Sequence, residues 1–240
     1  GSPPWQVPLH QCRADLVAGD ARLLTPPVGV PVIELFAEGD VGTNLSTRRL
    51  DADVAPDLFR RYEVAGAPHV DTFETRALPR SADVLRAGGR AVTGDDPTCT
   101  PAGVETSDFR NRHAFNAAWR NLDAWVRTGR AAPKAPWLRV KPGVTETVFD
   151  PASAFETDAA GNALGGVRSL DVDVPRVRWV GAKRGGFSCM FYGYRLPLPE
   201  AELARRYPER QAYRRSLRRR ADELQEMRWL TPEDRRDALR

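Results

Sequence analysis

Two short apolar runs, each ending in ionisable residues beside a glycine, constrain the fold of this chain most. The first, residues 30–36 (Val-Pro-Val-Ile-Glu-Leu-Phe), is followed by Ala-Glu-Gly-Asp, which ends at Asp40. The second, residues 58–64, is followed by Ala-Gly-Ala-Pro-His, which ends at His69. Short runs rich in apolar and β-branched residues and bounded by turn formers are typical of buried strands. We therefore expect two strands whose carboxyl ends carry an acid and a histidine.

The first run is nearly continuous in apolar residues rather than alternating, which predicts a parallel strand covered on both faces. About 20 residues separate the two runs, enough for a short crossover between parallel neighbours. The residues between them, 42–57, are expected to form a polar loop. Ligands of open α/β sheets bind outside the carboxyl ends of the strands, so we expect the chemistry there.

His69 is the candidate general base and acid, because a histidine beside a carboxylate can take and return a proton while the acid fixes its tautomer. Asp40 is the first choice for that acid, and Glu38 is the alternative. Extended backbone would point both carboxylates to the same side. One of them would orient the histidine and the other would support the loop. His10 and His113 are expected to be structural or solvated, with His113 on the exposed side of its helix.

Helical periodicity is clearest in the middle of the chain and near its end. A helix is predicted from an N-cap at Ser107 or Asp108 to Gly129, with the larger apolar residues on one face. That face would contain Phe115, Ala118, Trp119, Leu122, Trp125 and Val126. Further helices are predicted at 200–207 and 209–227, and a last one after the N-cap Thr231.

The remaining segments have loop or β character. Residues 1–27 are an irregular, proline-rich lead-in, and residues 72–103 are expected to be a loop. A short strand is predicted at 137–140, a hairpin pairs 154–157 with 163–167, and edge strands follow at 170–174 and 177–180.

Composition excludes several classes of protein. A chain of 240 residues with 41% hydrophobic residues can fill a core, and no apolar run is long enough to span a membrane. We expect a soluble protein, and the compartment, cytoplasmic or secreted, stays open. The net charge of +4 comes mostly from arginine spread along the chain, and no nucleic-acid partner is expected. Cys12, Cys99 and Cys189 lack CxxC spacing, so no zinc site is expected; a disulfide between two of them and buried free thiols both remain open.

The order of strand, acid, loop, strand and Gly-x-x-His resembles the last two core strands of an α/β-hydrolase. The amino-acid sequence is similar to one branch of that superfamily, the large bacterial "α/β-hydrolase domain" proteins. This similarity rests on Val30-Pro31-Val32, on Glu38-Gly39-Asp40 and, most specifically, on the segment 61–69 (Arg-Tyr-Glu-Val-Ala-Gly-Ala-Pro-His). Weaker similarity extends the resemblance over roughly residues 28–240.

The resemblance implies a serine hydrolase with a Ser-His-Asp/Glu triad that acts on a small-molecule ester or amide and needs no metal or organic cofactor. Such enzymes carry the nucleophile on a Gly-x-Ser-x-Gly elbow before the acid and the histidine. No serine here has that setting; Ser188 lacks the second glycine and follows His69. Residues 28–240 would then be the C-terminal half of the domain, whose partner is an N-terminal half, as a separate or cleaved chain, or a second copy. The alternative is a non-catalytic binding or assembly module with a hydrolase-like sheet.

Overall fold

A three-stranded sheet forms one end of the molecule. The computed structural model describes residues 29–71, 81–89, 98–145 and 149–240. Strands β1 (Val32–Ala37) and β3 (Asp57–Val64) pair in parallel, with Val32 opposite Phe59 and Ala37 opposite Val64. Both predicted strands are therefore confirmed. The segment expected to be a polar loop also contains β2 (Ala52–Val54), which pairs antiparallel with β3 and gives the order β1-β3-β2.

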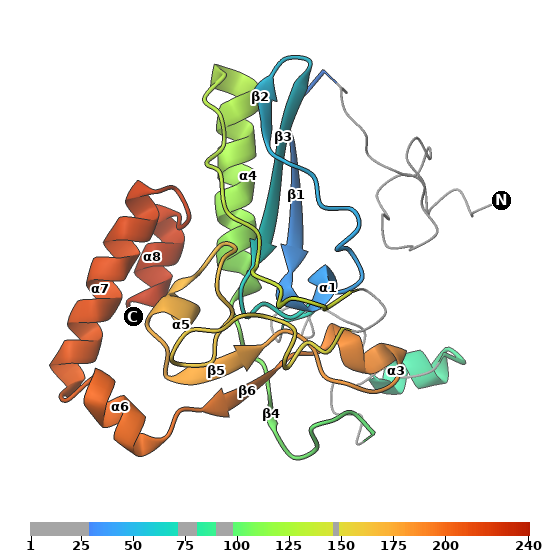
Figure 1. Cartoon of the computed structure of the whole chain (residues 1–240), viewed down its shortest axis with the longest axis vertical. Helices are drawn as coiled ribbons and strands as arrows, with labels where there is room; N and C mark the ends of the chain where they lie inside the picture. The colour runs from blue at the N-terminus through green and yellow to red at the C-terminus, as the bar shows by residue number, and fades with distance from the viewer. Residues whose placement is uncertain (1–28, 72–80, 90–97, 146–148) are drawn as a thin grey trace.

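Helix α4 (Asn111–Thr128) lies along this sheet (Figure 1). It ends at Gly129 with φ at 72°, as predicted, but it begins after Arg110 rather than after Ser107 or Asp108. The predicted buried face is confirmed for Ala118 and Trp125 and wrong for Phe115, Trp119 and Val126. Small residues such as Ala114 and Ala118, together with Trp125, face the interior, whereas Phe115, Trp119 and Val126 are exposed. Small side chains let the helix approach the sheet closely, and most of the bulky ones are left outside.

A second small sheet lies beyond the carboxyl ends of β1 and β3 (Figure 1). It has the order β4-β6-β5, formed by Glu105–Thr106, Tyr194–Pro197 and Val177–Val180. The predicted edge strand at 177–180 is confirmed as β5. The strand predicted at 170–174 is wrong, because Leu170–Asp173 forms the one-turn helix α5. Its Asp171 binds Arg110 and its Asp173 binds Arg220, and these tertiary ion pairs outweigh local β preference.

The predicted hairpin between 154–157 and 163–167 forms through the single bridge of Thr157 to Ala163 rather than through continuous strands. The predicted strand at 137–140 is likewise reduced to single bridges, for which the sequence assigned no partner: Leu138 bridges Gly165 and Val140 bridges Phe155. Within the segment predicted as a loop at 72–103, the described residues contain a short helix, α3 (Ser81–Arg86). The predicted lead-in at 1–27 lies outside the described residues.

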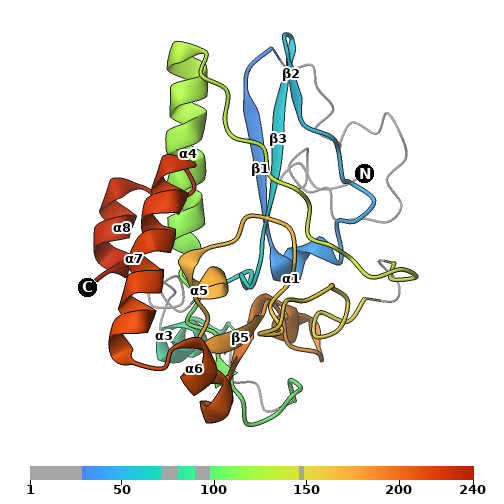
Figure 2. The ribbon, with the colours of Figure 1, turned by 60° about the vertical axis from the view of Figure 1, so that its left-hand side comes forward.

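Three helices close the chain: α6 (Glu200–Arg206), α7 (Arg210–Glu226) and α8 (Pro232–Ala238). The Thr231 side chain accepts the Asp234 amide, as predicted for its N-cap. Helix α8 lies against α4 (Figure 2), where Asn116 donates to Asp234. His113 of α4 is buried rather than exposed, contrary to the sequence prediction, with Nε2 3.3 Å from an Asp237 carboxylate oxygen.

Buried ion pairs connect β3 to its surroundings. The Glu63 carboxylate is fully buried and accepts hydrogen bonds from Arg48, from Arg61 and from the amide of Leu138. Arg48 comes from the segment read as a polar loop, so this loop is held to the sheet rather than solvated. A disulfide joins Cys99 to Cys189, which settles the pairing that the sequence left open. Cys189 lies in the 3-10 helix η3 (Phe187–Phe191).

Candidate active site

The two strand ends bring an acid and a histidine into contact. The chain leaves β1 directly into the one-turn helix α1 (Glu38–Val41), which carries Asp40. It leaves β3 through a sharp turn at Gly66, whose φ of +77° suits glycine, and reaches His69. The Nδ1 atom of His69 lies 2.7 Å from Oδ1 of Asp40. The two side chains are 46% and 27% exposed, so the pair lies at the surface rather than in the core.

Asp40 is held in place through both its side chain and its backbone carbonyl. Its second carboxylate oxygen accepts the backbone amide of Ala37 at 3.2 Å, and its carbonyl oxygen accepts the side-chain amide of Asn44 at 2.7 Å. A carboxylate anchored in this way can fix the tautomer of the imidazole by accepting the Nδ1 proton. With the proton on Nδ1, Nε2 is the ring nitrogen that can accept a proton.

Glu38 does not face the histidine. It is buried, and its two carboxylate oxygens accept the backbone amides of Gly66 at 2.6 Å and Gly181 at 3.0 Å. It thereby joins the turn that follows β3 to the end of β5. Burial raises the pKa of Glu38 to about 7, opposed by its two backbone hydrogen bonds. Of the two predicted acids, Asp40 meets His69 and Glu38 supports the adjoining turns.

Two elements, α4 and η3, hold the loop that carries His69. The side chain of Asn111, at the start of α4, donates to the carbonyl of Pro68 at 2.8 Å. The ring of Phe191 in η3 lies against the imidazole, with the ring centroids 4.9 Å apart. The Phe191 carbonyl also accepts the amide of Val70 at 3.0 Å. Sequence reasoning identified neither Asn111 nor Phe191. Asn111 belongs to no sequence motif, and Phe191 is far from His69 in the chain, close to a cysteine whose pairing the sequence left open.

A small hollow of about 130 Å³ opens beside the pair. Its walls are Leu35, Ala37, Asp40, Val64, Ala67, His69, Asn111, Ala114 and Phe115. The apolar side chains come from β1, β3 and α4, so the hollow lies where the sheet, the helix and the two catalytic candidates meet. The side-chain position of Ser188 lies outside what the structure describes, and so does His10.

No group of three or more possible metal ligands occurs within the described ranges 29–71, 81–89, 98–145 and 149–240. Across the same ranges, no helix is both long and apolar enough to cross a membrane.

Comparison with known families decides the class of the protein. A family model described as "Alpha/beta hydrolase domain" matches residues 1–240. The chain belongs to this alpha/beta hydrolase family. A search among curated proteins and a search among solved structures each returned no match. The alpha/beta hydrolase assignment agrees with the mixed helices and strands of the fold and indicates a hydrolase.

Proposed function

We propose that this chain supplies the histidine and the acid of a serine hydrolase that acts on carboxylic esters or, as a second substrate class, amides. The observation that carries the proposal is the 2.7 Å contact between His69 and Asp40 at the carboxyl ends of two parallel strands. In this mechanism Nε2 of His69 takes the proton of the serine hydroxyl as it attacks the ester carbonyl. The imidazolium, stabilised by Asp40, then gives that proton to the leaving alcohol.

The nucleophilic serine is proposed to come from another polypeptide segment, the N-terminal half of the domain on a separate or cleaved chain. No serine of the sequence stands in a Gly-x-Ser-x-Gly elbow. Among the described strands, β1 pairs only with β3, so its outer edge is open to a further strand. Helix α4 packs against β1, and its exposed apolar residues include Phe115, which lines the hollow beside His69.

Fluorophosphonate labelling of the native preparation, resolved by intact mass, tests the proposal. Label is expected on a second polypeptide or on a larger precursor. Label on this chain would place the nucleophile here, with Ser188 as the first residue to examine. An absence of label in an otherwise folded preparation would favour the non-catalytic binding or assembly module, whose support is the missing elbow.

Substitutions of the pair test the roles of its members. In a preparation that hydrolyses an aryl ester, Asp40→Asn is expected to lower kcat about 10⁴-fold, because the histidine loses the acceptor that fixes its tautomer. His69→Ala is expected to lower it at least as far. Asp123→Asn is the matched control, since Asp123 is an exposed acid paired with Arg127 on α4. Equal activity of the Asp40→Asn and Asp123→Asn variants would refute the role of Asp40.

A further inference from the structure

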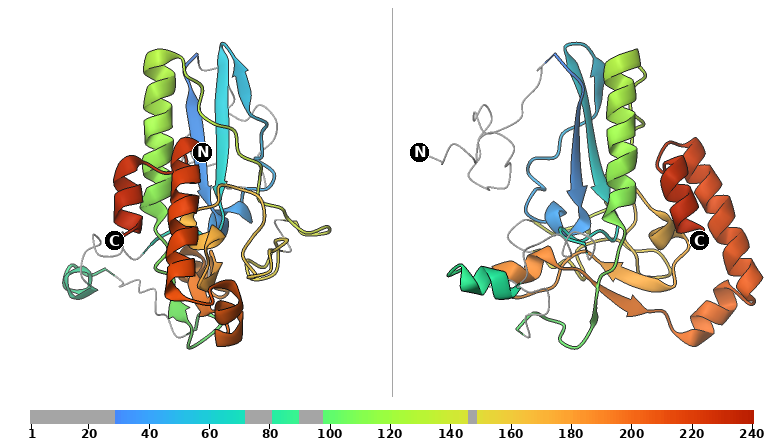
Figure 3. Two further views of the ribbon diagram at one scale, coloured as in Figure 1. Left: turned by 90° about the vertical axis from the view of Figure 1, so that its left-hand side faces the viewer. Right: turned by 180° about the vertical axis from the view of Figure 1, so that it is seen from behind.

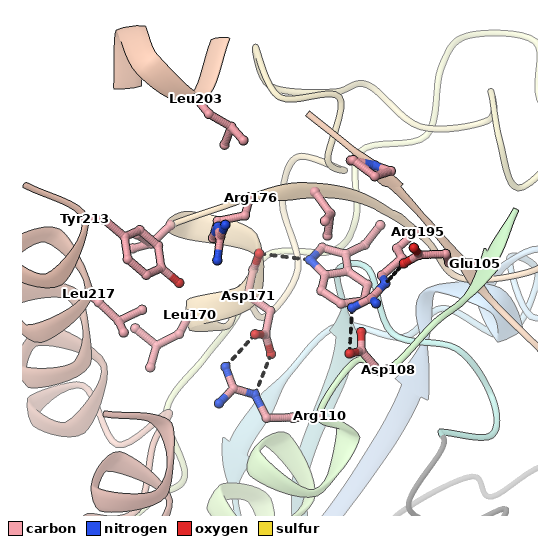
Figure 4. A pocket seen from close by; sticks show the side chains of 14 residues that line it. Glu105, Asp108, Arg110, Leu170, Asp171, Arg176, Arg195, Leu203, Tyr213 and Leu217 are labelled. Atoms are coloured by element: carbon pink, nitrogen blue, oxygen red, sulfur yellow. Dashed lines mark hydrogen bonds and ion pairs between the residues drawn. The ribbon is translucent and has the colours of Figure 1, made fainter. Parts of the chain in front are cut away.

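A larger hollow, of about 470 Å³, lies between the second sheet and the C-terminal helices. Figure 4 shows its side chains, which come from β4, β5, β6, α5, α6 and α7 and from the segment before α4. Asp108 and Arg110 line this hollow, whereas Asn111 lines the hollow beside His69. The two hollows are therefore different places, and nothing in the proposed hydrolase mechanism uses the larger one.

Most charges of the larger hollow are already paired. Arg110 holds Asp171 through two hydrogen bonds, and Arg195 binds both Glu105 and Asp108 (Figure 4). In these pairs, three carboxylates and two guanidinium groups bind one another. They form rigid polar walls and do not call for a charged ligand.

Arg176 is different. It lies at the start of β5 and is exposed, and within the described part of the chain no carboxylate lies within ion-pair distance of it. Its guanidinium carbon instead lies 5.8 Å from the ring centroid of Tyr213 on α7. Figure 4 shows the two side chains next to one another in the hollow. An arginine fixed over an aromatic ring and without an acidic partner is suited to bind an anion.

The surface around Arg176 is apolar. Leu170, Val174 and Trp179 are buried, and Leu203 and Leu217 are half-buried above and beside them. The volume lies in the range of small-molecule sites, which combine apolar walls with a few polar groups that fix the ligand. This hollow likewise combines apolar walls with one cation, Arg176, that has no ion pair among the described residues.

The groove continues past Arg176 into a neighbouring hollow of about 720 Å³. The two hollows share Arg176, Leu203, Tyr213 and Leu217. The second one adds Arg210 and Arg214 of α7, which also have no ion pair among the described residues. The available charges along the groove are therefore mostly positive, and they complement an anionic ligand.

We propose that this groove binds a small amphipathic carboxylate, an apolar body that carries a single anionic group. The carboxylate is bound by Arg176 beside the Tyr213 ring, and the apolar body lies on Trp179, Leu203 and Leu217. This site is independent of the proposed ester hydrolysis, because none of these residues lines the hollow beside His69.

Nuclear magnetic resonance of the indole groups tests the proposal on the purified chain. The probes are 4-phenylbutyrate and its neutral counterpart 4-phenylbutyramide, added in the millimolar range to ¹⁵N-labelled protein. The Trp179 and Trp119 signals are assigned from Trp179→Phe and Trp119→Phe variants. Phenylbutyrate is expected to shift the Trp179 indole and leave that of Trp119, on the exposed face of α4, in place. The carboxylate is expected to bind about tenfold more tightly than the amide.

Arginine variants separate specific binding from general attraction to a basic protein. Arg176→Gln is expected to abolish the preference for the carboxylate. Arg218→Gln is the matched control, because Arg218 is exposed on the same helix as Tyr213 and lines neither hollow. Tyr213→Phe, which keeps the ring, is expected to retain the preference.

Three results would overturn the proposal. Equal binding of carboxylate and amide would remove the role of charge, and equal behaviour of the Arg176→Gln and Arg218→Gln variants would remove the role of this arginine. A shift confined to the Trp119 indole, or no shift of either indole, would show that the groove is not the site. The indole spectrum of each variant shows whether the variant is folded, so a negative result is interpretable.

Discussion

Asp40 and Glu38 show how one turn of helix separates two acids into different roles. Extended backbone would place side chains two residues apart on the same side, which is why the sequence could not decide between them. Because residues 38–41 form a helical turn, the two side chains instead diverge by about 200° around its axis. Asp40 then meets His69, and Glu38 enters the interior. Both acids could be predicted as candidates from the sequence. Which of them contacts the histidine depends on the local backbone conformation, which only the fold shows.

The environment of Glu38 predicts a dependence of stability on pH. Its pKa is about 7 in the folded chain against an ordinary value of 4.5, so the folded state holds a proton that the unfolded chain has lost. The folded state is therefore favoured below about pH 4.5 and loses this advantage as the pH rises to about 7. Between pH 5 and pH 8 this group is expected to lower the free energy of unfolding by roughly 2 kcal/mol.

Glu38→Gln is expected to remove that dependence, measured as the difference between urea unfolding free energies at pH 5 and pH 8. The variant is also expected to be less stable at pH 5 by about 1–3 kcal/mol, because one glutamine oxygen cannot accept from both Gly66 and Gly181. Asp123→Asn serves again as the control. An unchanged pH dependence in the glutamine variant would mean that Glu38 does not titrate in this range.

Among the elements, helix α4 marks the limit of pattern reasoning. Its existence and its end at Gly129 follow from apolar spacing and from the glycine stop. Which face is buried does not follow, because close packing against the sheet selects small residues such as Ala114 and Ala118 over larger ones. The same applies to α5, where ion pairs to the distant Arg110 and Arg220 favour a helical turn over a strand. The spacing of apolar residues therefore predicts where helices and strands form better than it predicts which residues they contact.

The Cys99–Cys189 bond is expected to stabilise the wall beside His69. It closes a chain separation of 90 residues and anchors η3, whose Phe191 lies against the imidazole. Replacing both cysteines with alanine is expected to lower the free energy of unfolding by about 2–4 kcal/mol, because the unfolded chain gains freedom. Urea unfolding with and without a reducing agent measures this.

The control is built into that experiment. The reducing agent should destabilise the native chain and leave the alanine variant unaffected. A native chain whose unfolding midpoint is the same in both conditions would show that the bond does not contribute.

At the scale of the whole molecule, β1 is the last strand on one side of the first sheet among the described residues. The side of β1 away from β3 faces away from α6 and α7 (Figure 3), and Val30, Phe115, Trp119 and Val126 are all exposed. Isolated exposed apolar residues are ordinary, but a stripe along one helix beside an open strand edge is typical of a surface that associates. The parallel pair at this edge was predictable from the apolar runs. The surface itself was not, because the sequence assigned those side chains to the core.

Trp119→Glu is expected to weaken association through this surface. The native chain is expected to sediment as a species heavier than its 26.7 kDa mass, with the serine-bearing segment or with a second copy. The glutamate variant is expected to shift towards the single chain, because a charge placed in an apolar contact is costly to bury. Analytical ultracentrifugation measures both.

Met227→Glu is the matched control, since Met227 is an exposed apolar residue at the end of α7. Identical sedimentation of the native chain and the Trp119→Glu variant, or a native chain that is monomeric at every concentration, would contradict the predicted association surface.

The covalent bond between Cys99 and Cys189 also bears on how the protein is made. Bonds of this kind form and persist in oxidising compartments and are rare where thiols are kept reduced. Residue 189 is synthesised long after residue 69, so the wall that contacts the histidine is completed late and only once an oxidant is present. Production in a reducing cytosol is therefore expected to yield a folded sheet without a complete wall beside His69, and oxidatively refolded chain is the preparation to combine with the serine-bearing segment when activity is sought.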